Sequence, residues 1–143
     1  GVVSFSGKGA QILLSITGSP ELARKCMDQL PTGGKTPLAA GILQANELLR
    51  AERIRTPDAL QYLILISDGK ANIPLFGDPF EDAVFMAEQV RLSGVGAMVL
   101  DTENSYIRFG FAKQIAEHMN AEYVRLDDIS GTAVEENVRS FIN

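Results

Sequence analysis

The chain has few or none of several residues on which whole classes of protein depend. It contains one cysteine, one histidine and no tryptophan in 143 residues. A single cysteine excludes an internal disulfide framework and a cysteine-rich zinc site. The longest apolar runs, residues 62–66 and 95–100, have the length of strands and fall far short of the ~18 residues that a membrane-spanning helix needs. We therefore expect no membrane span.

The chain also lacks an excess of basic residues. It has 13 Lys and Arg against 18 Asp and Glu, a formal net charge of −5. Because nucleic-acid-binding domains usually carry a basic face, we expect no nucleic-acid partner. With 45% hydrophobic and 22% charged residues, the composition is that of a globular protein rather than a disordered chain. The length predicts one domain. The first residues lack a signal-peptide pattern and open within an apolar segment without a Met, so we expect a piece of a longer protein.

Strands and helices alternate along the sequence, which predicts an α/β fold with a mainly parallel sheet. A turn at residues 7–9 predicts a hairpin of the first two strands, and the apolar run 62–66 predicts a strand covered on both faces. Ser19 and Asp78 each precede a Pro and are predicted to cap helices. The predicted strands are 2–5, 10–16, 62–66, 95–100 and 122–126, and the predicted helices are 20–30, 37–54, 79–93, 109–119 and 132–142.

Two glycine-containing loops do not fit nucleotide-binding motifs. Gly34-Lys35-Thr36 matches the end of a P-loop, but Gln29 stands where a P-loop has its first glycine, and a predicted helix leads into the loop instead of a strand. The pair Gly7 and Gly9 lacks the third glycine of a dinucleotide fingerprint. We expect no nucleotide to be bound by this domain.

Asp68 and Thr36 are the stronger candidates for a functional site. Asp68 follows the buried strand 62–66, at the sheet edge where open α/β folds place ligands, and its carboxylate suits a hard cation such as Mg²⁺. The alternative for Asp68 is a residue that forms a turn or caps a helix. Thr36 places a hydroxyl in a Gly-rich loop, and its alternative is the N-cap of the helix that begins near Pro37.

Other reactive side chains have simpler interpretations. His118 is predicted to be a solvated surface residue and Cys26 a small core residue, because it shares a helical face with apolar neighbours. The pair Asp127 and Asp128 is predicted to form a turn or cap. Asp101 and Thr102 end the strand 95–100 near the same sheet edge as Asp68, so a supporting or partner-contacting role is open to them.

These loops together resemble the von Willebrand factor A (integrin I-like) family. Its metal-ion-dependent adhesion site uses three elements: Asp-x-Ser-x-Ser after the first strand, a Thr in a Gly-rich loop, and an Asp after the fourth strand. Thr36, within the segment 32–38, matches the second element, and Asp68, within Ser67-Asp68-Gly69, matches the third. The resemblance therefore implies that Thr36 and Asp68 hold a metal ion, Mg²⁺ or Mn²⁺, with Ser67, Gly69, Gly34, Asp101 and Thr102 supporting the site or touching a partner.

The resemblance is closer to one branch of the family, the C-terminal domain of the magnesium chelatase D subunit. The matching segments are 30–41, 67–72, 100–103 and 108–112, and the similarity covers almost the whole chain. The Asp-x-Ser-x-Ser element is absent. Its strand would be central in the implied order 3-2-1-4-5-6, between 2–5 and 62–66, so the domain is expected to be N-terminally incomplete. Either the natural protein supplies the missing strand, or the gap closes by direct pairing of these two strands or by exchange between chains, and the last alternative implies self-association.

The branch implies a function in ATP-driven insertion of Mg²⁺ into protoporphyrin IX, in chlorophyll and bacteriochlorophyll biosynthesis. This domain would be a non-catalytic, metal-dependent docking module. Its implied partners are the AAA+ ATPase subunit and the large porphyrin-binding subunit, and its implied location is the cytoplasm, or the plastid stroma in a plant or alga. Two alternatives remain open: a chelatase-like AAA+ partner protein of a non-photosynthetic organism, and an adhesion-type ligand-binding module.

Overall fold

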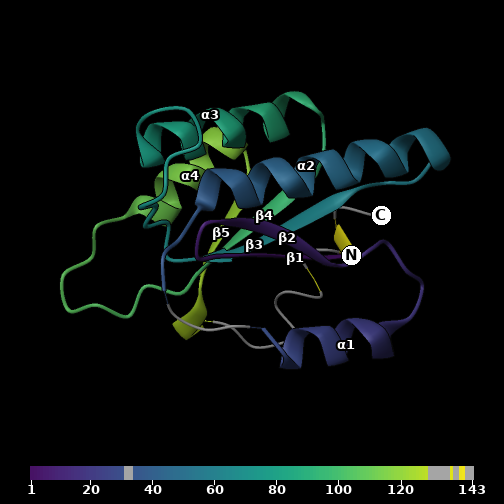
Figure 1. The fold of residues 1–143 in the computed structure, drawn as a ribbon, viewed down its shortest axis with the longest axis horizontal. Coiled ribbons are helices and arrows are strands. Elements are labelled where there is room, and N and C mark those ends of the chain that lie inside the picture. The colour runs from purple at the N-terminus through teal and green to yellow at the C-terminus, as the bar shows by residue number, and fades with distance from the viewer. Residues whose placement is uncertain (31–33, 129–135, 137–138, 141–143) are drawn as a thin grey trace. The chain divides into compact units, whose positions relative to one another are not determined.

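The computed structural model describes residues 1–30, 34–128, 136, 139 and 140 and confirms the α/β class (Figure 1). In chain order the elements are β1 (Val2–Ser6), β2 (Gly9–Leu14), α1 (Pro20–Asp28), α2 (Leu38–Arg55), β3 (Tyr62–Ser67), α3 (Pro79–Leu92), β4 (Gly96–Asp101), α4 (Phe111–Met119), β5 (Glu122–Arg125) and a short 3-10 helix, η1 (Leu126–Asp128). The predicted helix 132–142 lies largely outside the described residues, of which Glu136, Arg139 and Ser140 are helical. Within the described part of the chain, no helix is both long enough and apolar enough to cross a membrane.

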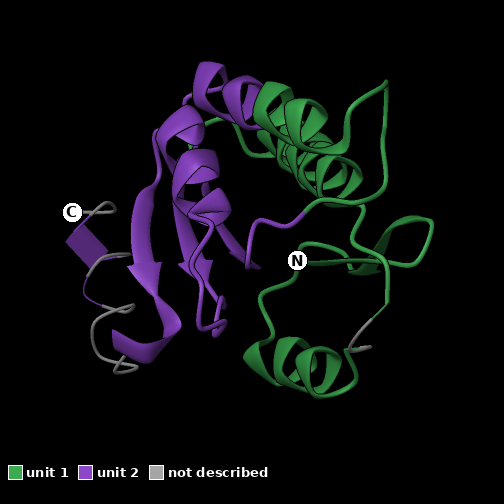
Figure 2. Cartoon of the chain, turned by 90° about the vertical axis from the view of Figure 1, so that its left-hand side faces the viewer, with its two compact units in different colours: residues 1–59, 71–86 green, residues 60–70, 87–143 purple. Residues whose placement is uncertain are grey.

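The described chain divides into two compact units (Figure 2). The first unit holds Gly1–Ala59 and Ala71–Met86, and the second holds Leu60–Lys70 and Ala87–Asn143. The strands form two separate sheets: β1 pairs with β2 in an antiparallel hairpin, and β3, β4 and β5 form a parallel sheet in that order. The hairpin and the parallel sheet were both predicted, but the antiparallel strand is not an edge of the parallel sheet.

The separation into two sheets tests how the predicted gap beside β1 closes. Among the described strands, β1 has only β2 as a neighbour and β3 has only β4. Direct pairing of β1 with β3, one of the two expected ways of closing the gap, is therefore wrong. Exchange of strands between chains stays a prediction.

The first unit places its hairpin between two helices, with α2 on one face and α1 on the other (Figures 1 and 2). Helix α2 packs closely, and Leu38, Ala39 and Ile42 are at most 1% exposed. Gly41 permits this approach, because a Cβ there would lie 2.5 Å from ring carbons of Phe5. The long helix α2 is thus fixed against the hairpin, which also fixes the loop that precedes the helix.

Helix α1 packs less tightly than its sequence predicts. Ser19 caps it as expected, since its Oγ accepts a hydrogen bond from Leu22 N at 3.3 Å. However, no α1 residue is buried, and Leu22 and Met27 remain about half exposed. Cys26 is half-buried rather than part of the core, so that prediction was wrong. The physical reason is a cavity between α1 and the hairpin, described below.

The second unit is built around β4, the central strand of the parallel sheet. Ala97, Met98, Val99 and Leu100 are all buried, so this strand is covered on both faces. Helix α4 packs against β4 and β5 with an apolar stripe at helical spacing. The stripe consists of Ala112, Ile115, Ala116 and Met119, none more than 1% exposed.

Strand β3 is not covered on both faces, contrary to the prediction. Leu65 and Ser67 are buried, but Ile64 and Ile66 are 41% and 47% exposed. Successive side chains of a strand point to opposite faces, so one face of β3 is buried and the other is open to solvent. The apolar run could not show this difference, because both faces carry apolar side chains.

Candidate functional site

Thr36 lies in the first unit, in the loop that leads into α2. Its backbone nitrogen donates a hydrogen bond to Asn72 Oδ1 at 2.7 Å, and Asn72 N donates to the carbonyl oxygen of Thr36 at 3.2 Å. The preceding residue, Lys35, accepts a backbone hydrogen bond from Gly7 N at 3.0 Å. The loop is therefore tied both to the hairpin and to the segment after β3. Gly34, in the same loop, has a φ of 90°. Residues 32 and 33 lie outside the described part of the chain.

The hydroxyl of Thr36 does not cap helix α2. The N-cap is Pro37 and the helix begins at Leu38, with no side-chain hydrogen bond at the cap. The alternative interpretation of Thr36 as an N-cap residue is thus wrong. Both hydrogen bonds to Asn72 use the Thr36 backbone, so neither of them occupies the hydroxyl.

Asp68 lies in the second unit, directly after β3, as predicted. Its Oδ1 accepts a hydrogen bond from Lys70 N at 2.9 Å, and the hydroxyl of Ser67 accepts one from Gly69 N at 3.0 Å. Asp68 is partly exposed. One carboxylate oxygen therefore stabilises the turn, and the other takes no part in this hydrogen bond.

Gly69 is required in this turn for two reasons. Its φ is 78°, in the left-handed region that other residues rarely adopt. A Cβ at this position would also overlap the backbone of Phe111 and Ala112 at the start of α4. The turn that carries Asp68 is consequently packed against the first turn of α4.

The second unit gathers five of the predicted site residues at one edge of its sheet. Ser67 and Asp101 are paired in register at the ends of β3 and β4, and Thr102 N donates to the Ser67 carbonyl oxygen at 3.3 Å. Asp68 and Gly69 follow Ser67 directly. Thr36 and Gly34 belong to the first unit.

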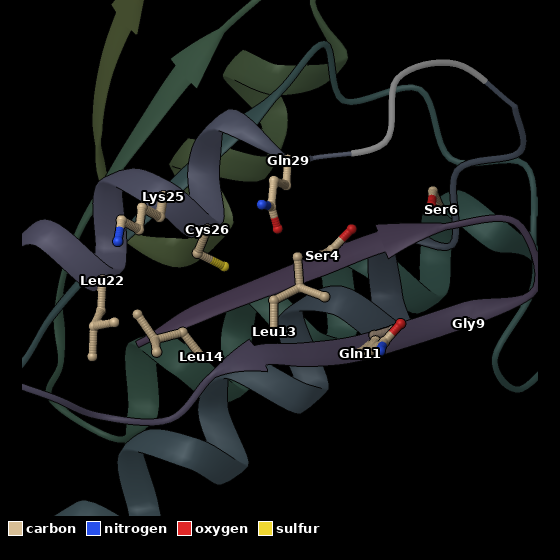
Figure 3. A pocket seen from close by; sticks show the side chains of 11 residues that line it. Ser4, Ser6, Gly9, Gln11, Leu13, Leu14, Leu22, Lys25, Cys26 and Gln29 are labelled. Atoms are coloured by element: carbon tan, nitrogen blue, oxygen red, sulfur yellow. The ribbon is translucent and has the colours of Figure 1, made fainter.

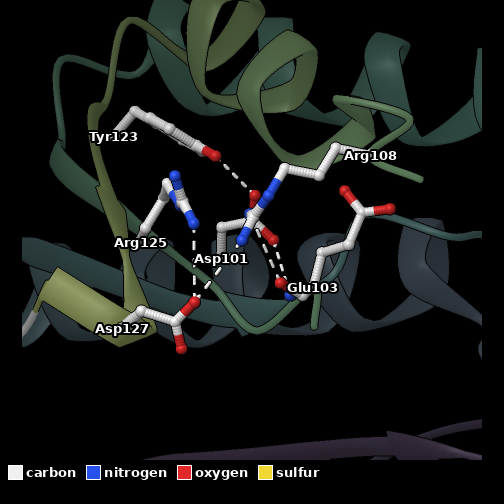
Figure 4. A network of polar contacts seen from close by, with 6 residues as sticks. All are labelled: Asp101, Glu103, Arg108, Tyr123, Arg125 and Asp127. Carbon is white, nitrogen blue, oxygen red and sulfur yellow. Dashed lines mark hydrogen bonds and ion pairs between the residues drawn. The ribbon is translucent and has the colours of Figure 1, made fainter. Parts of the chain in front are cut away.

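Asp101 is a buried carboxylate whose two oxygens are both engaged within the chain (Figure 4). It is 3% exposed; Oδ1 accepts from Glu103 N at 2.8 Å, and Oδ2 accepts from the Tyr123 hydroxyl at 2.5 Å. Burial of Tyr123, together with the charge and the hydrogen bond of Asp101, raises the pKa of the Tyr123 phenol to about 12. Asp101 therefore acts through hydrogen bonds that fix the edge of the sheet.

Two arginines beside this pair were not found from the sequence. Nη2 of Arg108 and Nη2 of Arg125 each lie 3.4 Å from Oδ2 of Asp127 (Figure 4). Asp127 was predicted to form a turn or cap, and it does lie in η1, but its carboxylate also pairs with both arginines. Asn72 was missed in the same way. No local pattern identifies Arg108 and Asn72, since their partners lie 19 and 36 positions away, and the Arg125–Asp127 pair of near neighbours has no motif of its own.

His118 is exposed as predicted, and its Nδ1 lies 3.0 Å from Glu88 Oε1. Its pairing with Glu88 joins α4 to α3 within the second unit. Because both side chains are about 40% exposed, such a pair contributes little to stability.

A cavity of about 750 Å³ lies in the first unit between the hairpin and α1 (Figure 3). Its described lining mixes polar and apolar side chains, among them Ser4, Leu13, Leu22, Cys26 and Gln29, together with the charged Lys25. None of the predicted site residues contributes to it. The cavity explains the incomplete burial of α1 and leaves Cys26 facing open space.

The donor chemistry of Thr36 and Asp68 fits a hard cation in part. A hydroxyl and a carboxylate are oxygen ligands of the kind that Mg²⁺ takes, but Mg²⁺ requires about six. Among the described residues there is no group of three or more His, Cys, Asp and Glu side chains that could hold a metal ion. A cation bound by either residue would need further oxygen ligands beyond this one.

Comparison with known proteins gives the family. No protein-family model matches the chain. The chain is 32% identical over 131 residues to an uncharacterized protein of Methanocaldococcus jannaschii, covering 91% of this chain and 75% of that protein. The chain belongs to the same family as this protein. A second uncharacterized relative, from Mycobacterium tuberculosis, is 34% identical over 138 residues.

The chain is also similar to a segment of magnesium chelatase subunits. It is 33% identical over 152 residues to the magnesium-chelatase 67 kDa subunit of Heliobacterium mobile, covering 99% of this chain. The match covers only 22% of that subunit, and likewise only 22% of the Mycobacterium tuberculosis relative. The chain thus corresponds to about a fifth of these two longer proteins.

Proposed function

We propose that the chain is a metal-dependent docking module of a chelatase-type complex, in the manner of a magnesium chelatase D subunit. The observation that carries the proposal is the similarity to magnesium-chelatase subunits over 94% to 99% of this chain. The fold and the position of Asp68 after β3 agree with the von Willebrand factor A type of site. In this proposal the complex inserts Mg²⁺ into protoporphyrin IX with energy from ATP, and this module is not the catalyst.

In the proposed site Thr36 and Asp68 each provide one oxygen ligand to Mg²⁺. Asn72 supports this assignment, because it holds the Thr36 backbone and follows Asp68 by only four positions in the sequence. A bound Mg²⁺ would supply the positive charge that attracts a partner's carboxylate. Thr36 would orient its hydroxyl, and Asp68 its free oxygen, while the partner's carboxylate and water complete the ligand set.

The proposed partners are the AAA+ ATPase subunit and the porphyrin-binding large subunit of the complex. Docking that needs both a metal ion and a carboxylate from the partner would couple assembly to the conformation of either protein. Self-association through the outer edges of β1 and β3 is a further part of the proposal.

A chelatase-like complex outside chlorophyll synthesis is the second candidate. The observation in its favour is the match to 75% of the length of the uncharacterized Methanocaldococcus jannaschii protein. The two candidates predict the same metal-dependent docking and differ in the partner. Binding to a magnesium chelatase AAA+ subunit separates them.

The first test is a calorimetric titration of Mn²⁺, as a substitute for Mg²⁺, into the chain and into Asp68→Ala. We expect binding by the wild type and at least about a tenfold loss of affinity in the variant, since a charged ligand is removed. Asp58→Ala is the matched control, because Asp58 is an exposed carboxylate in the connector before β3. Equal Mn²⁺ affinity of the wild type and Asp68→Ala would contradict the proposed site.

The second test measures docking itself, with the AAA+ subunit of a magnesium chelatase immobilised and Mg²⁺ present or replaced by EDTA. We expect the wild-type chain to bind only with Mg²⁺ and Asp68→Ala to bind weakly under both conditions. The melting temperature of Asp68→Ala should stay close to that of the wild type, because Asp68 is partly exposed. Equal docking by both proteins would rule out a role for Asp68.

A further inference from the structure

We propose that Arg108 and Arg125 form a carboxylate-binding site for an acidic segment of a partner protein, and that Asp127 occupies this site within the chain. The two arginines lie in the second unit, one in the loop before α4 and the other at the end of β5 (Figure 4). The site requires no metal ion, so it stands independently of the function proposed above.

The contacts of Asp127 are those of a weak internal ligand. Both arginines approach the same oxygen, Oδ2, and each at 3.4 Å. Good arginine–carboxylate contacts are shorter and use two nitrogens and both oxygens. The Asp127 side chain is 63% exposed, and exposed ion pairs of this kind contribute little. An external carboxylate could therefore displace Asp127 at small cost.

Arg125 also has an unused donor. Its Nε is buried and has no hydrogen-bond partner among the described residues. A buried N–H without an acceptor is unfavourable, so a carboxylate that shifts the Arg125 side chain far enough to reach Nε as well as Nη2 would gain a hydrogen bond that Asp127 does not make. The arrangement favours a ligand with two oxygens in one plane.

Arg108 is held in place by the loop that precedes it. Nη1 of Arg108 donates to the Glu103 carbonyl oxygen at 3.4 Å, and the Tyr123 hydroxyl is fixed on Asp101 (Figure 4). Both guanidinium groups are close enough to Tyr123 that their charge lowers its pKa, although burial and Asp101 outweigh this effect. The two guanidinium groups therefore meet at the Asp127 carboxylate, near the hydrogen-bonded pair of Tyr123 and Asp101.

The neighbouring loop indicates that the carboxylate belongs to a protein. Tyr106 is fully exposed and Ile107 is 68% exposed, and both directly precede Arg108. Phe109 N donates to Glu103 Oε1 at 3.1 Å, which closes the loop at its base and presents its tip to solvent. Tyrosine and arginine are enriched among the residues that dominate protein interfaces.

Lys70 adds positive charge at the same loop. Its Nζ lies 5.3 Å from the centre of the Phe109 ring and 3.4 Å from the Ser105 hydroxyl. A partner segment with a carboxylate between apolar side chains would match both the arginines and the exposed Tyr106 and Ile107. A free oxyanion would match the arginines alone.

The test uses NMR of the arginine side chains and loop amides of the 143-residue chain, in EDTA. The probes are a short peptide with glutamates between leucines, the same peptide with glutamines, and inorganic phosphate. We expect the glutamate peptide alone to shift the signals of Arg108, Arg125 and the loop tip. Asp127→Asn should bind it about tenfold more tightly, because the internal competitor is removed. Asp128→Asn, the same change one residue further on, is the matched control and should bind as the wild type does.

Loss of the arginine is tested with Arg125→Gln, which should abolish peptide binding, and with Arg125→Lys, which keeps the charge but not the planar donor pair. Tyr106→Ser tests the contribution of the loop, because it removes only an exposed side chain. It should lower the affinity for the glutamate peptide several-fold. Equal binding of the glutamate and glutamine peptides, or equal affinity of Asp127→Asn and Asp128→Asn, would overturn the proposal. The proposal would also be overturned if phosphate binds and if Tyr106→Ser leaves the peptide affinity unchanged. Those two results together would show a site for free oxyanions.

Discussion

Thr36 and Asn72 hold each other through two backbone-directed hydrogen bonds, although 36 residues separate them. Asn72 Oδ1 accepts from Thr36 N at 2.7 Å, and Asn72 N donates to the Thr36 carbonyl oxygen at 3.2 Å. The pair fixes the backbone of the loop and leaves the Thr36 hydroxyl out of both contacts. This relationship gives Asn72 a positioning role that its place in a polar loop does not reveal.

Asn72→Ala should lower the free energy of unfolding by about 1 kcal/mol, because it removes one hydrogen bond and leaves Thr36 N to water. Under the proposed function it should also weaken Mn²⁺ binding, since the backbone that carries the Thr36 hydroxyl loses one of its two hydrogen bonds to residue 72. Urea unfolding and calorimetry provide the two measurements. Asn104→Ala, in another exposed loop, is the control and should change neither. Unchanged stability in Asn72→Ala would show that the Thr36–Asn72 pair is weak in solution.

Leu65→Ala should cost about 2–5 kcal/mol of unfolding free energy, because it leaves a space in the buried face of the second unit. Ile64→Ala is the matched control on the same strand, and it should cost clearly less, since Ile64 is 41% exposed. Chemical denaturation of both variants compares the two faces of β3. Equal losses would mean that the exposed face of β3 is covered in solution, for example by a second copy of the chain.

Tyr123→Phe should destabilise the second unit by about 1–3 kcal/mol, because the buried Asp101 carboxylate loses a hydroxyl donor. The pH dependence follows from the pKa of Tyr123, which is raised from 10.0 to about 12 on folding. A raised folded pKa means that the contribution is complete below pH 10 and is lost as the pH rises towards 12.

Urea unfolding of the wild type and Tyr123→Phe through this alkaline range measures that contribution. The difference between the two proteins should shrink as the pH rises. A difference that stays constant across the range would show that the Tyr123 phenol does not titrate in contact with Asp101.

Asp82→Asn should destabilise the first turn of α3 at neutral pH. Desolvation raises the pKa of Asp82, but hydrogen bonds from the backbone N–H groups of Phe76, Gly77 and Leu75 outweigh it, so the pKa lies below the ordinary value of 3.8. A lowered folded pKa gives stability that is complete above that value and is lost as the pH falls through the folded pKa.

The matching measurement is thermal unfolding of Asp82→Asn and the wild type from neutral to acidic pH. The higher melting temperature of the wild type relative to Asp82→Asn should disappear only at acidic pH. Asp58→Asn, at an exposed carboxylate, is the control and should follow the wild type. An advantage that persists in strong acid would assign the effect to packing instead of charge.

Local signals were sufficient where partners lie close together in the sequence. The helix starts at Ser19 and Asp78 were predicted because a cap joins residues two or three positions apart, and both caps are present. The polar turn at Asp68 was predicted because a strand must end before it. For Thr36 the local signals left two roles, metal ligand and N-cap, and the start of α2 one residue later than expected excludes the N-cap.

The surroundings of β3 and Cys26 could not be predicted in this way. Whether Ile64 is covered depends on what packs on its face of β3, and the apolar run does not record that. Whether Cys26 is buried depends on how closely α1 approaches the hairpin. The pairs Tyr123–Asp101 and Arg108–Asp127 join residues 22 and 19 positions apart, so no local pattern records them.

The sequence by itself determined the α/β class, the order of the elements and the polar loops that carry Thr36 and Asp68, because periodicity and capping are short-range properties of a chain. Tertiary structure alone decided that the strands form two sheets, that Asn72 holds the loop of Thr36, and that two arginines meet on Asp127. These features depend on contacts between distant segments, whose free energies are settled only when the whole chain packs.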